Sequence, residues 1–206
     1  MNRESLRGIL TEISRLMEEQ KEYLIELDQQ NGDGDLGISM SEGYRAVKEY
    51  LDNTQEKDLG RLMQGCGKVF NEAAPSSLGT ITAFGFMGMA KALKGREEVD
   101  FLEASQAMRR GIENIMEKAG AKPGEKTILD ALCPGVEAMI KYGMNPKMAV
   151  EEGSRAASDG SEATRQMKSV HGRAAYYGDK SIGILDGGSV VGKLIFVGIR
   201  NWYLSK

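Results

Sequence analysis

Apolar residues recur at steps of three and four along most of this chain, which is the spacing of one buried face of an α-helix. The clearest run covers residues 5–27 and stops where an Asp- and Gly-rich stretch begins at Asp28. No segment alternates apolar and polar residues with the period of two that a half-buried strand requires. We therefore predict an all-α protein, with about eight helices in a single domain over residues 1–206.

Helix-capping residues and sequence breaks divide the rest of the chain. A second, shorter helix is expected around residues 44–51, and a buried helix that packs closely through Gly85 and Gly88 is expected over residues 81–93. Ser, Asn and Asp at the start of an apolar run favour the first position of a helix. The N-caps predicted on this basis are Asp58, Asp100 and Asn145.

Four polar stretches rich in Gly, Ser or Asp are predicted to be loops between helix ends. Besides the Asp-rich stretch they are residues 73–80, 119–126 and 168–188, the last lying between a helix that ends near Met167 and one that begins at Ser189. In an up-and-down bundle such loops could converge at one end. Convergent loops on a rigid scaffold commonly carry binding and catalytic residues.

Composition argues against two classes of partner. The net charge is -3 and the isoelectric point is about 5.4, so there is no electrostatic case for nucleic acid. No stretch approaches the length of a membrane span, and the first residues lack the apolar region of a signal peptide, so we expect a cytoplasmic protein. Cys66 and Cys133 are expected to be buried reduced thiols.

The sharpest chemical feature is the sequence LDQQNGDGDLG, which places Asp28, Asp33 and Asp35 within eight positions. Mg²⁺ prefers hard oxygen ligands and is commonly held by a few carboxylates together with substrate phosphates. The intervening glycines would let the backbone turn so that alternate side chains point inward. From this cluster alone, a solvated Asx-rich turn is an equally good interpretation.

Two other nucleotide or metal motifs fail on their key residues. Counted as an EF-hand from Asp33, the sixth position is Ile38 instead of Gly and the twelfth is Tyr44 instead of Glu. The sequence GGSVVGKL at 187–194 has the spacing of a P-loop, but Leu194 stands where Ser or Thr is needed and no strand precedes it. Lys193 is therefore expected on a helix surface.

The stretch 171–181, HGRAAYYGDKS, holds two further candidates. His171 is the one His of the chain and is interpreted as an ordinary loop residue, since a single His cannot form a His-based metal site. Arg173 could neutralise phosphate in a bidentate manner, with a surface salt bridge as the equally good alternative.

Four motifs in order resemble one known family. LDQQNGDGDLG, APSSLGT, KPGEKTILDALCP and GRAAYYGDKSIGILDGG together look like the L-subunit family of dihydroxyacetone kinases, and the resemblance runs from about Tyr23 to Phe196. It implies an eight-helix antiparallel up-and-down barrel with the nucleotide site at one end. This agrees with the helix count reached from periodicity.

The resemblance also implies a role for each residue at a matching position. Asp28, Asp33 and Asp35 would hold two Mg²⁺ that bridge to the phosphates of ADP or ATP, and Arg173 would be the catalytic residue near those phosphates. The residues expected to bind the nucleotide are Gly37, Ile38 and Ser39 after the Asp cluster, Ser77 and Leu78 with Thr80 close by in the second phosphate loop, Gly120 and Ile128 beside the adenine, Arg173 itself, and Asp186 with Gly188 in the closing turn.

The chain departs from the family pattern at three places. Leu36 replaces a His found in some members, PSSLGT replaces a GGASG-type loop, and Gly187 replaces the Pro of the closing D-P-G turn. These changes affect the expected substrate and phosphate source more than nucleotide binding itself.

The function implied is phosphoryl transfer to a small ketose such as dihydroxyacetone, by positioning and charge neutralisation. The ketose would be held by a separate K subunit, and ATP or a phosphotransferase-system phosphocarrier acting through bound ADP would supply the phosphate. We also expect a homodimer and no nucleic-acid or membrane partner. Two alternatives remain, a nucleotide-binding regulatory module without turnover and a helical scaffold.

Overall fold

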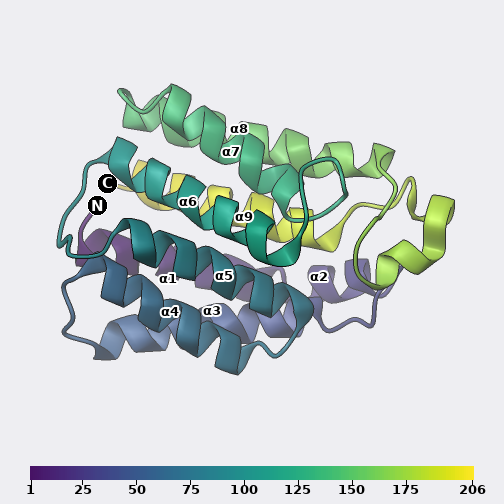
Figure 1. Ribbon diagram of the computed structural model, residues 1–206, viewed down its shortest axis with the longest axis horizontal. Coiled ribbons are helices and arrows are strands. Elements are labelled where there is room, and N and C mark those ends of the chain that lie inside the picture. Colours follow the sequence, from purple (N-terminus) through teal and green to yellow (C-terminus); the bar gives the residue numbers. More distant parts are fainter.

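Antiparallel helices joined mostly by short loops build the molecule, as Figure 1 shows for the computed structural model, which describes all 206 residues. The structure has no strand, and one isolated bridge joins Asn2 and Glu98. The helices are α1 (Arg3–Glu19), α2 (Lys21–Asp28), α3 (Leu36–Asn53), α4 (Leu59–Ala73), α5 (Ser77–Ala92), α6 (Phe101–Ala119), α7 (Leu129–Lys141), α8 (Pro146–Ala163) and α9 (Gly187–Leu204), with 3₁₀ segments η1 (Thr164–Gln166) and η2 (Arg173–Ser181).

The helices close into a ring. Each of α3 to α9 packs against the helix before it along the chain, except that α3 packs on both α1 and α2, and α9 returns to pack on α1. Because α2 continues from α1 toward the same end of the molecule after a break at Gln20 (Figure 1), the ring is an eight-member up-and-down barrel. The all-α expectation is confirmed.

One apolar core fills most of the space inside the ring. It joins 37 buried residues, of which Phe70 and Phe196 are the largest that are almost fully buried. An apolar cavity of about 430 Å³ remains inside and is bordered mainly by α1, α5, α6 and α9. None of the helices is both long and apolar enough to cross a membrane.

The predicted caps are confirmed. Asp58, Asp100 and Asn145 each accept a hydrogen bond from a backbone amide three residues later, at 3.0, 2.7 and 3.2 Å. The close packing predicted for α5 is also present, because a methyl group added at Gly88 would lie 2.6 Å from the carbonyl oxygen of Arg110 on α6.

Several predicted boundaries were wrong. The run 5–27 is divided at Gln20. The helix expected at 44–51 is the 18-residue α3, which begins at Leu36, directly after the Asp cluster. The predicted loop 168–188 contains η2, and α9 begins at Gly187 instead of Ser189 because Asp186 provides its cap. Cys133 is half-buried, whereas Cys66 is buried as expected.

The direction of the helices decides where the site lies. Helices α3, α5, α7 and α9 all begin at the barrel end where α2 stops at Asp28, and both chain termini lie at the opposite end (Figure 1). The four predicted loops therefore share one end. Direct contacts tie three of them together. The fourth, predicted at 73–80, is shorter than expected because α5 already begins at Ser77, and it lies at that end through the direction of α4 and α5.

Candidate functional site

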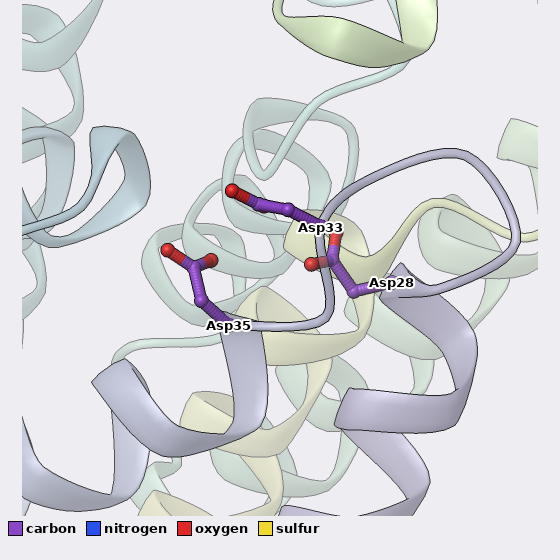
Figure 2. A group of neighbouring side chains, drawn as sticks. All are labelled: Asp28, Asp33 and Asp35. Atoms are coloured by element: carbon purple, nitrogen blue, oxygen red, sulfur yellow. The ribbon is translucent and has the colours of Figure 1, made fainter.

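The three aspartates of LDQQNGDGDLG come from consecutive structural elements. Asp28 is the last residue of α2, Asp33 lies in the loop, and Asp35 immediately precedes α3. Each offers one carboxylate oxygen, and these oxygens lie within 4.8 Å of one another. Figure 2 shows the side chains directed into a common space above the start of α3. The structure thus brings the predicted metal ligands together.

The loop folds back on Asp28. Its carbonyl oxygen accepts hydrogen bonds from the amides of Asn31 and Gly32, at 3.2 and 2.6 Å, and its carboxylate accepts one from the amide of Gly34 at 2.8 Å. Gly34 has a φ of +78°, and a side chain at Gly32 would overlap the Asp28 carboxylate. Both glycines are therefore required by the geometry that orients this ligand.

Electrostatics favours a cation in this space. Nη2 of Arg173 lies 2.7 Å from Oδ2 of Asp33 and offsets part of the negative charge. The pKa of Asp35 is nevertheless raised, first by burial of its carboxyl group and then by the charges of Asp33 and Asp28. Because all donors are hard oxygens, the ligands that Mg²⁺ prefers, the residues fit a divalent metal.

The start of α3 adds free backbone donors beside the triad. Asp35 occupies the N-cap position but its side chain makes no capping hydrogen bond, so the first amides of the helix lack an intrahelical partner. Gly37 and Ile38 belong to this turn, and Ile38 is 42% exposed. Ser39 differs, because its amide and hydroxyl both donate to the Asp35 carbonyl oxygen at 2.9 Å. Free amides at a helix start favour anions such as phosphate.

Helix α5 begins at the same end with a capped first turn. Ser76 accepts a hydrogen bond from the amide of Gly79 at 3.1 Å, and its carbonyl oxygen accepts one from the amide of Thr80 at 3.0 Å. This leaves the amides of Ser77 and Leu78 as the free donors. Thr80, which was also predicted to bind the nucleotide, can do so only through its side chain, because its amide already donates to Ser76.

The remaining predicted nucleotide-binding residues lie in the turns around α7 and α9. Gly120 ends α6 in the left-handed conformation, and Ile128 is buried just before α7. A side chain at Gly188 would lie 3.3 Å from the amide of Ile128, so the starts of α7 and α9 adjoin. Asp186 caps α9 through the amide of Ser189 at 2.6 Å, and burial raises the pKa of Asp186 to about 7.

Two departures from the family pattern contact each other. Leu36 is buried at the start of α3, and a side chain built at Gly187 would overlap its Cδ2 atom. The Leu therefore occupies the space into which the family's Pro would project. Leu36 and Gly187 are far apart in the sequence, and the fold brings them together.

Sequence reasoning missed the role of the loop before α7. Glu125 contacts Nε2 of His171 at 2.6 Å, and Lys126 has a buried ammonium group and a φ of +61°. Burial lowers the pKa of Lys126, and the charge of Asp186 opposes this. The P-loop-like sequence, as expected, is only the start of α9, with Lys193 half-buried on it.

Comparison with known proteins gives a consistent result. The DAK2 domain family matches residues 30–201, and the chain belongs to this family. It is 29% identical over 192 residues to the ADP-binding subunit DhaL of the PEP-dependent dihydroxyacetone kinase of Escherichia coli, covering 92% of this chain and 91% of the relative. A second such subunit, from Listeria innocua, is 31% identical over 88% of this chain and 86% of its own length.

Longer kinases contain a similar portion. The L-erythrulose 1-kinase of Mycolicibacterium smegmatis is 26% identical over 89% of this chain, which spans 33% of that protein. The dihydroxyacetone kinase of C. freundii, solved in complex with AMP-PNP and Mg²⁺, shares the fold with a TM-score of 0.77 and 21% identity. That match covers 95% of this chain and 33% of the solved one.

Proposed function

We propose that this chain is the nucleotide-binding, phosphoryl-transferring subunit of a kinase acting on dihydroxyacetone or a related small ketose. The observation that carries the proposal is the triad of Asp28, Asp33 and Asp35, which converges within 4.8 Å at the barrel end where helices begin. Relatives named as dihydroxyacetone and erythrulose kinases support the reaction class. A structural neighbour solved with AMP-PNP and Mg²⁺ supports a metal-bound nucleotide.

Different groups of site residues would bind different parts of the metal–nucleotide complex. Two Mg²⁺ bound by the Asp triad would supply charge neutralisation for the nucleotide phosphates. The free amides at the starts of α3 and α5 donate to phosphate oxygens, and Gly120 and Ile128 border the base. Asp186 and Gly188 hold the closing turn of α9. Catalysis on this chain therefore needs positioning and charge, and no protein nucleophile.

Arg173 is the proposed catalytic residue. Its side chain is 67% exposed, and its guanidinium group pairs with Asp33. When a cation satisfies Asp33, the guanidinium group is free to turn to the phosphates, where its planar donors match two oxygens at once. The Arg173 side chain thus offsets the negative charge of the Asp triad when no nucleotide is bound. It offsets the negative charge of the phosphoryl group when nucleotide and Mg²⁺ are bound.

A ketose-binding K subunit is the proposed partner, approaching from the nucleotide end. Apolar side chains are exposed there around the candidate site, with Tyr176 at 93% and Val170 at 54%. Such residues favour a protein contact where they gather. Tyr176 lies three residues after Arg173, so a partner on this surface would bring its substrate to the phosphates.

The phosphate source has two candidates, ATP itself or a phosphotransferase-system phosphocarrier that recharges bound ADP. Relatives named as PEP-dependent, ADP-binding subunits favour the second. The dissociation rate of ADP from the purified chain separates them. ADP that leaves within seconds supports exchangeable ATP, and ADP that remains through gel filtration supports the cofactor role.

The test of the main proposal is turnover in a reconstituted mixture. The chain, a K subunit, dihydroxyacetone and a phosphate donor should together form dihydroxyacetone phosphate, and Asp33→Ala or Asp35→Ala should abolish Mg²⁺-dependent ADP binding and turnover. Lys91→Met, an exposed change on α5, serves as control. ADP affinity unaffected by either Asp change would overturn the proposal.

A regulatory module without turnover is the second candidate. The contact between Leu36 and Gly187 favours it, because both differ from the family pattern beside the triad. This module would bind ADP with Mg²⁺ as the kinase does. Normal binding without product formation, with both donors and a competent K subunit supplied, would support it over the kinase.

A further inference from the structure

Lys126 is a buried cation that the proposed chemistry does not use. The residue is 3% exposed. Its ammonium group donates to three backbone carbonyl oxygens, those of Met167 at 3.2 Å, Ser181 at 2.5 Å and Ile184 at 2.7 Å. Its φ of +61° is the one positive value outside glycine. Burying an ammonium group and holding a side-chain residue in this conformation are both unfavourable, so the surroundings must enforce them.

The three carbonyl groups belong to the loop that carries Arg173. This loop covers residues 167–184, with Met167 at its start and Ser181 and Ile184 near its end, so one ammonium group joins the two sides of the loop. A second contact supports the first, because the amide of Ser169 donates to the hydroxyl group of Ser181 at 3.0 Å. The large side chains of Val170, Tyr176, Tyr177 and Ile182 in the loop are exposed, so these polar contacts fix its path.

The loop reaches the Asp triad through Arg173. Arg173 lies at the first position of η2 and reaches Asp33, while His171 is held by Glu125, the neighbour of Lys126. A continuous set of contacts therefore runs from the loop before α7, through residues 167–184, to the guanidinium group at the site.

We propose that Lys126 is a positioning residue, which fixes the 167–184 loop so that Arg173 faces the metal-bound phosphates. This inference rests on the proposed nucleotide site and adds to it a residue that positions Arg173. All three hydrogen bonds of the Lys126 ammonium group go to the loop and none goes to the Asp triad. Its effect on binding therefore passes through Arg173, and a purely structural lysine would lack this dependence.

A double-mutant cycle tests the dependence. The dissociation constant of ADP is measured at saturating Mg²⁺ for wild type, Lys126→Met, Arg173→Ala and the double variant. Each single change should weaken binding by about tenfold, the loss of one charge-assisted contact. The double variant should be no more than about twofold weaker than Arg173→Ala, because coupled residues are not additive. Independent losses, which multiply to about a hundredfold, would overturn the proposal.

Trypsin provides a second readout that needs no nucleotide. Lys168, Arg173 and Lys180 lie exposed in the loop, and cleavage there should be faster in Lys126→Met than in Lys91→Met, while cleavage elsewhere is unchanged. Equal loop cleavage in the two variants would contradict the positioning role. If Lys126→Met does not fold, Lys126→Arg takes its place in the same cycle, because it keeps charge and donors but displaces the loop.

The outcomes separate this inference from the function on which it rests. Absence of Mg²⁺-dependent ADP binding in wild type, or binding that ignores Asp33→Ala, removes the proposed site and the inference with it. If wild type binds ADP in a way that depends on Asp33 and Arg173, but the effects of Lys126→Met and Arg173→Ala are additive, only the role of Lys126 is rejected.

Discussion

Asp186 connects protonation to folding. Its carboxyl group caps α9, and burial raises its pKa to about 7 against an ordinary value of 3.8. Since the folded state binds this proton more tightly than the unfolded chain, the group stabilises the fold at low pH and loses that contribution as pH rises from about 4 through 7.

Asp186→Asn, which resembles the protonated acid and still accepts from Ser189, should therefore remove this pH dependence. We expect it to match wild type near pH 4 and to exceed its free energy of unfolding at pH 8 by about 2 kcal/mol. The full pKa difference would give about 4 kcal/mol, but the residue keeps some contact with water. Urea unfolding at both pH values measures this, and a constant difference would contradict it.

Leu36 and Gly187 give a second prediction at the residue scale. Gly187→Ala should destabilise the protein by about 1–3 kcal/mol, since the added methyl group overlaps Leu36. Adding Leu36→Ala should remove most of the overlap penalty, so the two changes together should cost less than the sum of the single ones. Additive free energies of unfolding would show that the contact is unimportant.

At the scale of elements, the packing of α5 on α6 depends more on Gly88 than on Gly85, which lies one turn earlier. A methyl group at Gly88 would lie 2.6 Å from the Arg110 carbonyl oxygen, whereas one at Gly85 would meet only the flexible end of Ile115 at 3.2 Å. Gly88→Ala should lower the free energy of unfolding by about 1–3 kcal/mol.

Gly85→Ala is the matched control in the same helix. It should be neutral or slightly stabilising, because Ala favours a helix over Gly by up to about 1 kcal/mol. Thermal unfolding of both variants separates packing from helix propensity. Equal losses in the two variants would mean that the interface does not require close approach at Gly88.

The elements also show what sequence can predict. Caps such as Asp58 and Asn145 are local chemistry, so their positions followed from a few neighbouring residues. The start of α3 did not, because its buried residues Leu36 and Met40 stand among Gly and Ser directly after the Asp-rich loop. The presence of η2 did not either, because only Ser181 of this segment is buried. Within the candidate site, the Asp triad was visible from spacing, but Lys126 acts on carbonyl groups of a distant segment. Only the three-dimensional fold places them together.

For the whole molecule, the two ends of the barrel should behave differently toward a partner. Tyr176 at the nucleotide end and Met144 in the turn between α7 and α8 at the other end are both 93% exposed. Tyr176→Ser should weaken binding of the K subunit by about tenfold, since aromatic anchors carry much of the binding energy of an interface.

Met144→Ser is the control of equal exposure and should leave K-subunit affinity unchanged. Isothermal titration against the K subunit in the presence of ADP and Mg²⁺ gives both values. A larger loss from Met144→Ser would place the interface at the end that carries the termini and would contradict the proposed approach.

The position of the termini sets a tether length for any fused protein. Both ends of the chain lie opposite the end of the barrel where α2 stops at Asp28 (Figure 1). Helix α3 alone, with 18 residues, spans about 27 Å at the usual rise of an α-helix. A covalently attached domain that must reach the nucleotide therefore needs roughly eight or more extended linker residues along the barrel wall. Conversely, an affinity tag or a surface anchor at either terminus leaves the phosphate-binding end facing free solution.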